Sequence, residues 1–231
     1  MEKSILFEAI LFDLDGTLLN TLEDLADAAN RVLSRNGFPG HPMDAYRHMV
    51  GDGVAVLMHR ALPEDKRSED IIRVCMQAFR EEYARTWYIK TNPYDGVAEM
   101  LDRLTAHGIK MAVLSNKPDE FTKQCVTKFL PKWHFNLVMG HNNSFPLKPD
   151  PASAGAIARC LNIPPSQFIY LGDTAIDMKT AVAAGMFPVG ALWGFRTGKE
   201  LLENGAQALV KKPQEILNLL DINSQSNEKF I

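Results

Sequence analysis

One apolar run near the start of the chain ends in two acids, in the sequence Ile10-Leu11-Phe12-Asp13-Leu14-Asp15-Gly16-Thr17. The run has the composition of a buried strand, and side chains alternate between the two faces of a strand. If the strand continues, Asp13 and Asp15 lie on one side and Leu14 on the other. Two carboxylates held this close repel each other unless a cation lies between them or they share a proton. The stretch therefore indicates either a cation site or an acid-rich turn after a strand.

From residue 93 onward, helical and strand-like segments alternate along the chain. The apolar periodicity predicts strands at 109–114, 137–140, 168–171, 188–191 and 208–210. It predicts helices at 96–107, 119–130, 151–161, 175–185, 198–204 and 213–220. Together with the strand before Asp13, this order predicts an α/β fold with a parallel sheet covered by helices on both faces.

Residues 18–92 differ, because no strand pattern is evident there. Thr21 is placed to cap a helix, with Asp24 three residues later in place of the usual Glu, and Gly37 ends that helix. Further helices are expected at 43–50, 53–62 and 68–86. We therefore expect an all-helical insert at 18–92, a core made of 1–17 and 93–222, and a polar tail at 223–231.

Composition excludes several functional classes. The chain has 231 residues, of which 46% are hydrophobic, and a formal net charge of −3, which gives no reason to expect a nucleic-acid partner. Its three cysteines, Cys75, Cys125 and Cys160, are far apart and odd in number, which favours free thiols in a cytoplasmic protein. No segment has the roughly 20 apolar residues of a membrane span, and no signal peptide is expected.

Polar residues follow two more of the predicted strands. In an open parallel sheet, ligands bind at the carboxyl ends of the strands, so these residues are expected to meet in one crevice. Ser115 and Asn116 follow the strand at 109–114 and offer donors for phosphate oxygens, although an ordinary Ser-Asn turn has the same pattern. Asp173 follows the strand at 168–171, and Asp177 lies one helical turn further on.

Two charged residues near these strand ends allow more than one interpretation. Pro149 and Pro151 hold Lys148 on an extended segment, where it either offsets the charge of a carboxylate cluster or is simply solvated. Asp177 either faces the crevice beside Asp173 or only stabilises the N-terminus of its helix. Carboxylate oxygens are ligands that suit Mg²⁺, so the acids predict a magnesium site.

In their order and spacing, these motifs resemble those of the haloacid dehalogenase superfamily: D-x-D-G-T near the N-terminus, a strand-end serine, a K-P loop and G-D-x-x-x-D. Within that superfamily the chain is similar to the phosphoglycolate phosphatase-type hydrolases. The stretch Val50-Gly51-Asp52-Gly53 resembles their glycine-bearing cap loop. The resemblance covers the chain to about residue 220. It implies a Rossmann-like core, a mobile helical cap, Mg²⁺ and a small phosphorylated substrate.

The resemblance also implies roles for single residues. Asp13 matches the nucleophile that forms an aspartyl-phosphate, and Asp15 matches the general acid/base. Lys148 matches the lysine that restrains the nucleophile and stabilises the transferring charge. The remaining implied positions are phosphate binding at Thr17, Ser115 and Asn116, and metal binding at Asp13, the backbone carbonyl of Asp15, Asp173 and Asp177.

The expected activity is thus Mg²⁺-dependent hydrolysis of a phosphomonoester, with 2-phosphoglycolate the first substrate to test. Alternatives are a sugar phosphomutase of the β-phosphoglucomutase type, a phosphatase of another small metabolite, and a non-catalytic binding module. The acid at Asp15 disfavours dehalogenation, because a departing halide needs no proton. Arg60 either meets a substrate carboxylate or is a solvated helix arginine. The segment 193–196 either lines the crevice entrance or only packs against its neighbours in the fold.

Overall fold

The structure, a computed structural model, describes residues 7–220, so the expected tail at 223–231 lies outside the described residues. Its centre is a six-stranded sheet in which every neighbouring pair is parallel, in the order β5-β4-β1-β6-β7-β8. The strands are β1 (Ala9–Phe12), β4 (Lys110–Pro118), β5 (Leu137–His141), β6 (Phe168–Gly172), β7 (Phe187–Ala191) and β8 (Ala208–Val210). The predicted α/β class is confirmed.

Alternation along β1 explains why both faces of the sheet are covered. Ile10 and Phe12 belong to one buried apolar cluster, and Ala9 and Leu11 belong to another. The first cluster contains residues of α5 (Val97–Ala106), α6 (Asp119–Phe129) and the 3-10 helix η3 (Pro213–Leu220). The second contains residues of α7 (Ala152–Leu161) and α8 (Ala175–Ala184). A further helix, α9 (Gly198–Glu203), precedes β8.

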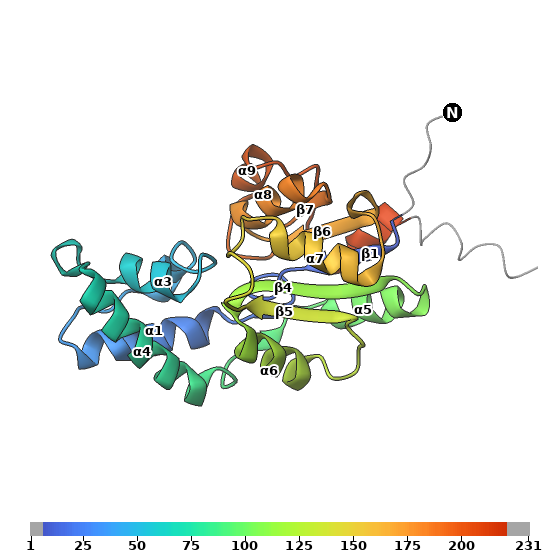
Figure 1. Cartoon of the computed structure of the whole chain (residues 1–231). Helices are drawn as coiled ribbons and strands as arrows, with labels where there is room; N and C mark the ends of the chain where they lie inside the picture. Colours follow the sequence, from blue (N-terminus) through green and yellow to red (C-terminus); the bar gives the residue numbers. More distant parts are fainter. Residues whose placement is uncertain (1–6, 221–231) are drawn as a thin grey trace, which may run out of the picture.

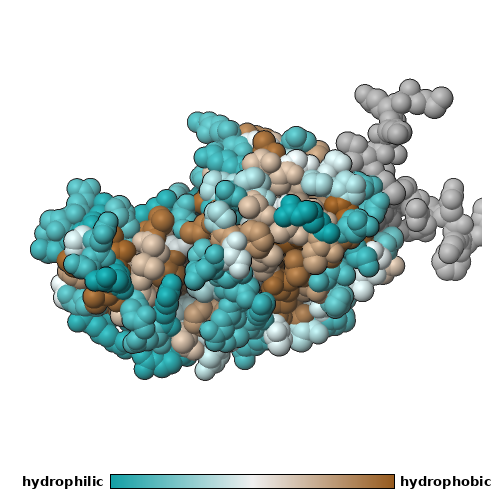
Figure 2. Space-filling view, viewed as in Figure 1, coloured by the Kyte–Doolittle hydropathy of each residue, from teal (hydrophilic) through white to brown (hydrophobic). Residues whose placement is uncertain are grey.

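Four of the helices between β1 and β4 form a separate lobe, which we call the cap lobe: α1 (Leu22–Arg35), α2 (Met43–Tyr46), α3 (Val54–Ala61) and α4 (Glu69–Thr86). A short 3-10 helix, η1 (Glu64–Lys66), joins α3 to α4. Figure 1 shows this lobe beside the sheet, on the side toward which β4 and β5 point. Hydrophilic residues predominate on the outside of the lobe in the face shown in Figure 2.

A buried acid forms hydrogen bonds between the two long cap helices. Glu82 of α4 accepts hydrogen bonds from Arg31, at 3.2 Å, and from Arg35 of α1, at 2.8 Å. Its side chain is 6% exposed, and a carboxylate so removed from water needs such partners. The cap lobe therefore has its own internal polar contacts in addition to its apolar core.

The connections between the cap lobe and the sheet differ from expectation in two ways. Leu19–Asn20 forms a two-residue strand, β2, antiparallel to β3 (Asn92–Pro93), where no strand was expected. Asp24 does not complete a capping box with Thr21, whose side chain caps nothing. The Asp24 carboxylate instead accepts hydrogen bonds from the backbone N–H groups of Lys90 and Thr91 and from the Thr91 hydroxyl. Asp24 therefore joins the two connecting segments, a role that depends on tertiary contacts.

Two other predicted helices differ from the structure. The helix expected at 43–50 ends at Tyr46, and the chain then turns through Gly51 and Gly53, whose φ angles are 109° and 89°. Only glycine adopts such angles without strain, so the loop at 50–53 depends on these two residues. The last predicted helix, at 213–220, is a 3-10 helix. Within the described residues, no helix combines the length and apolarity needed to cross a membrane.

Candidate active site

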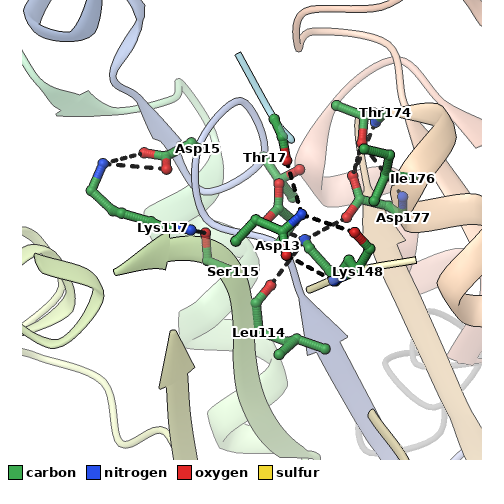
Figure 3. A network of polar contacts seen from close by, with 12 residues as sticks. Asp13, Asp15, Thr17, Leu114, Ser115, Lys117, Lys148, Thr174, Ile176 and Asp177 are labelled. Carbon is green, nitrogen blue, oxygen red and sulfur yellow. Dashed lines mark hydrogen bonds and ion pairs between the residues drawn. The ribbon is translucent and has the colours of Figure 1, made fainter. Parts of the chain in front are cut away.

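Polar residues at or near the ends of three neighbouring strands meet at one edge of the sheet. Asp13 follows β1, Ser115 lies near the end of β4, and Asp173 follows β6, and these strands are adjacent in the order β4-β1-β6. Figure 3 shows Asp13 among Ser115, Lys148 and Asp177, at the ends of these strands. The sequence prediction that these groups lie together is confirmed by their positions.

Lys148 binds two acids from different parts of the chain. Its Nζ donates to Asp13 Oδ1 at 2.8 Å, to Asp177 Oδ1 at 2.7 Å and to the carbonyl oxygen of Leu114 at 3.2 Å. The Lys148 side chain is 3% exposed. Burial alone would lower its pKa, but the carboxylates of Asp13 and Asp177 raise the pKa of Lys148 well above its usual value. Lys148 is therefore a buried ammonium in the cluster, and the solvated-loop interpretation is wrong.

Three buried acids surround a small volume beside this lysine. Asp13, Asp173 and Asp177 each offer a carboxylate oxygen, and these oxygens lie within 4.8 Å of one another. Burial and the charge of Asp177 raise the pKa of Asp13 from 3.8 to about 7. Burial and the charge of Asp13 likewise raise the pKa of Asp173 well above its usual value. One ammonium does not balance three carboxylates, so the cluster fits a divalent cation with oxygen ligands.

Neighbours hold Asp173 from both sides. Its Oδ1 accepts a hydrogen bond from the Thr17 hydroxyl at 3.0 Å, and its Oδ2 accepts one from the backbone N–H of Phe195 at 2.7 Å. Trp193 Nε1 in turn donates to the carbonyl oxygen of Thr17. Thr17 is fully buried and its hydroxyl is already donated to Asp173, so it orients an acid here instead of facing a phosphate. The segment containing Trp193 and Phe195 packs against the site.

Asp177 combines the two roles that its position suggested. Its Oδ2 accepts hydrogen bonds from the backbone N–H and the hydroxyl of Thr174. The Asp177 N–H in turn donates to the Thr174 hydroxyl oxygen, so the two residues form a capping box at the start of α8. Its Oδ1 accepts the hydrogen bond from Lys148. The helix N-terminus thus fixes one oxygen of Asp177, while the other faces the acid cluster.

Asn116 makes contacts that the sequence did not predict. Its Nδ2 donates to the carbonyl oxygens of Gly51, at 3.1 Å, and of Lys148, at 3.2 Å. Its Oδ1 accepts from the backbone N–H of Lys148 at 2.8 Å. Both side-chain donors are therefore used, and the Asn116 amide joins the cap loop to the lysine segment where a phosphate contact was expected. Ser115 lies beside it and is 4% exposed.

Sequence reasoning missed a polar contact involving Lys117. Its Nζ donates to Asp15 Oδ1 at 3.0 Å, to Asp15 Oδ2 at 3.2 Å and to the Tyr83 hydroxyl at 2.8 Å. Figure 3 shows Lys117 reaching Asp15 on the side of Ser115 away from Lys148. The signal available was a lysine directly after the strand-end Ser-Asn pair. Its partner Tyr83 belongs to α4 of the cap lobe, and nothing in the sequence pattern connects the two.

A cavity between the two lobes opens onto Asp13. It has a volume of about 630 Å³, part of which is open to solvent. Asp13, Asp15 and Ser115 belong to its polar lining. Most of its cap-lobe lining is apolar and comprises Leu25, Val50, Val54, Leu57, Phe79 and Tyr83, with Arg80 as a charged exception. The site therefore joins a charged end, at the sheet edge, to a largely apolar chamber under the cap lobe.

Arg60 supports the cap loop. Its guanidinium donates to the carboxylate of Asp52 and to the carbonyl oxygens of His48 and Met49. These contacts fix the segment that leads into Gly51 and Gly53, which line the cavity. Arg60 itself is not among the residues that line the cavity, and its side chain is 38% exposed but bonded to the cap loop, so it is more than a solvated helix arginine. A contact with substrate stays a prediction.

Comparison with known proteins gives a consistent result. Residues 10–191 match the family described as haloacid dehalogenase-like hydrolase. The chain is 31% identical to a phosphoglycolate phosphatase from Nitrosospira multiformis, over 94% of this chain and 97% of that one. It is 34% identical to a phosphoglycolate phosphatase from Psychrobacter arcticus, over 87% and 88% of the respective chains. The crystal structure of a predicted phosphoglycolate phosphatase from Haemophilus somnus matches with a TM-score of 0.85 and 27% identity, over 92% and 97%. With this fold and these strand-end acids, the chain belongs to the haloacid dehalogenase-like hydrolase family.

Proposed function

We propose that this protein is a Mg²⁺-dependent hydrolase of small phosphomonoesters, with 2-phosphoglycolate as its first candidate substrate. The observation that carries the proposal is the contact of one buried ammonium, Lys148, with Asp177 and with Asp13, the acid that lines the cavity. The curated relatives from Nitrosospira and Psychrobacter, which span nearly the whole chain, support phosphoglycolate in particular. The free cysteines, two of them buried, support a reducing compartment such as the cytoplasm.

In the first step, a carboxylate oxygen of Asp13 attacks the phosphorus atom of the substrate. The new Asp13 O–P bond forms as the P–O bond to the leaving group breaks. The leaving oxygen takes a proton from the Asp15 carboxyl group, so that an alcohol departs. Asp13 and Asp15 both line the cavity, as two residues that act on the same phosphoryl group must.

In the second step, a water molecule attacks the phosphorus of the aspartyl-phosphate. Asp15, now a carboxylate, takes a proton from that water as the new O–P bond forms and the Asp13 O–P bond breaks. Inorganic phosphate is released, and both acids return to their starting states. No other reactant is required.

Charge neutralisation and positioning supply most of the rate of a phosphoryl transfer. Lys148 holds Asp13 in place and adds positive charge beside the transferring group, and Ser115 offers a hydroxyl to a phosphate oxygen. Asp13, Asp173, Asp177 and the backbone carbonyl of Asp15 are the groups proposed to hold Mg²⁺. When bound, Mg²⁺ supplies positive charge for the phosphate oxygens and for the acids themselves.

The proposal includes the division of the chain. Residues 1–17 and 93–222 act as the catalytic core, and residues 18–92 act as a cap that covers the substrate. The position of the cavity between the cap lobe and the sheet edge supports this division. The contacts of Asn116 with Gly51 and Lys148 connect the two parts beside the site.

A direct test uses Asp13→Asn, which keeps the shape of the side chain and removes the nucleophilic carboxylate. The wild-type protein is screened for phosphate release from phosphorylated metabolites with Mg²⁺, and the substrates are ranked by kcat/KM. We expect 2-phosphoglycolate to rank first and Asp13→Asn to release no phosphate while remaining folded by circular dichroism. Near-normal turnover by Asp13→Asn would falsify the nucleophile assignment.

A further inference from the structure

We propose that Tyr83 and Lys117 are positioning residues for Asp15, so that cap helix α4 determines where the proton donor and acceptor of the reaction lies. The inference depends on the role given to Asp15 above. It adds two residues that the motifs of the catalytic core do not include. One of them, Tyr83, belongs to the cap lobe.

Lys117 is placed to fix the Asp15 side chain. Its Nζ lies 3.0 and 3.2 Å from the two carboxylate oxygens of Asp15. The Lys117 side chain is 3% exposed, whereas that of Asp15 is 16% exposed and faces the cavity. The backbone of Lys117 is fixed as well, since it belongs to β4 and its N–H donates to Ser115 Oγ at 3.2 Å. The Lys117 ammonium, whose backbone lies in a rigid strand, therefore restrains the position of the Asp15 carboxyl group.

Tyr83 in turn fixes the ammonium. Its hydroxyl accepts a hydrogen bond from Lys117 Nζ at 2.8 Å, and the ammonium lies 4.7 Å from the centre of its ring. The ring stacks on Phe79 of the same helix, with an interplanar angle of 9°, and meets Phe121 of α6 nearly edge-on. Aromatic neighbours from both lobes thus hold Tyr83 in one orientation.

Through these non-covalent contacts the cap lobe influences the position of a group that takes part in the reaction. A proton reaches the leaving oxygen only if the Asp15 carboxyl group lies within hydrogen-bond distance of it. The chain of contacts from Tyr83 through Lys117 to Asp15 sets that location. Displacement of α4 would therefore move Asp15 relative to Asp13 while the nucleophile stays bound to Lys148.

The experiment compares two substrates that differ in their need for a proton. The alkoxide of 2-phosphoglycolate must be protonated as it leaves, whereas the nitrophenolate of p-nitrophenyl phosphate leaves without a proton. Tyr83→Phe keeps the ring contacts and removes the hydroxyl. We expect its kcat/KM to fall about tenfold for 2-phosphoglycolate and less than about twofold for p-nitrophenyl phosphate. The tenfold loss is a fraction of the usual rate effect of general acid catalysis. For Lys117→Met we expect a larger loss of kcat/KM on 2-phosphoglycolate, and again a smaller loss on p-nitrophenyl phosphate.

The matched control is Tyr46→Phe, which removes another buried cap-lobe hydroxyl, one that bonds to Asn30 instead of Lys117. Its two kcat/KM values are expected to keep the wild-type ratio. Equal losses on both substrates, or no loss for either positioning variant, would overturn the inference. Asp15→Asn separates this failure from failure of the proposed function: if it shows the leaving-group selectivity and Tyr83→Phe does not, only the positioning role is wrong.

Discussion

The Nζ atom of Lys148 lies 2.8 Å from Oδ1 of Asp13, although 135 positions of sequence separate the two residues. Lys148 comes from the segment between β5 and α7, whereas Asp13 follows the central strand β1. The same ammonium contacts Asp177, and Asp173 lies close to both acids. The folded state therefore places three buried acids close together and only one ammonium in contact with two of them, so the acids outnumber the cationic groups that contact them within the described residues.

Replacement of Lys148 by methionine should destabilise the metal-free protein. The variant leaves Asp13 and Asp177 without the ammonium that contacts them, and loss of one partner from a buried pair typically costs about 3–5 kcal/mol of unfolding free energy. Urea denaturation in EDTA measures the change. Lys123→Met is the control, because Lys123 is 59% exposed and its pair with Asp119 on α6 should contribute little. Equal stability of the two variants would contradict the prediction.

Magnesium should stabilise the protein more at pH 8 than at pH 5. The pKa of Asp13 is raised from 3.8 to about 7 in the folded, metal-free protein. Between these values the folded state binds a proton that the unfolded chain has lost, so this group contributes less stability as the pH rises from about 4 to 7. The pKa of Asp173 is raised in the same direction. A divalent cation competes with these protons, and its affinity therefore increases with pH.

The measurement is thermal unfolding in EDTA and in Mg²⁺ at both pH values. The increase in midpoint temperature caused by Mg²⁺ should be larger at pH 8. An increase that is as large at pH 5 would show that the metal does not bind the deprotonated acids. Asp173→Asn provides the comparison, since loss of one ligand should reduce the increase at pH 8.

The close approach of the site residues was predictable from the sequence, because it follows from the topology of a parallel sheet. Carboxyl ends of parallel strands share one edge, so Asp13, Ser115 and Asp173 meet wherever the strand order places them side by side. Lys148 was also predictable in part, because two prolines keep its segment extended and three acids need a cation. The catalytic roles of these residues remain predictions.

The partners of Thr17, Asn116 and Lys117 were not predictable in the same way. A hydroxyl or amide next to a strand end has several donors and acceptors within reach, and tertiary packing determines which one it binds. Thr17 binds Asp173, and Asn116 binds the cap loop and the lysine segment. Lys117 binds Tyr83 because α4 packs there, which periodicity along the sequence does not reveal.

Replacement of Arg60 by alanine should raise KM for the substrate more than it lowers kcat. Arg60 holds the carbonyl oxygens of His48 and Met49 and the carboxylate of Asp52, and so fixes the loop that lines the cavity. A less ordered loop weakens substrate binding but leaves Asp13 and Asp15 in place, so a KM increase of about three- to tenfold is expected. Arg73→Ala on α4 is the control, because Arg73 is exposed and its ion pair, with Asp70 of the same helix, lies at the surface. A change confined to kcat would contradict this role.

Gly194 is the position where a single added methyl group should disturb metal binding. A Cβ atom at Gly194 would lie 2.2 Å from the Cβ of Asp173, closer than such atoms approach in proteins. Since the N–H of Phe195 and the Thr17 hydroxyl hold Asp173 from either side, the acid can yield only by leaving the cluster. Gly194→Ala should therefore weaken Mg²⁺ affinity by about tenfold or more, as disturbance of groups around a metal ligand commonly does.

Gly155→Ala makes the same substitution within α7, where the nearest atom lies 3.4 Å away at the end of the Arg159 side chain, and should leave the affinity unchanged. Titration of activity with Mg²⁺, and of the Mg²⁺-induced shift in unfolding temperature, measures both variants. Identical titrations would mean that Asp173 does not contact the metal.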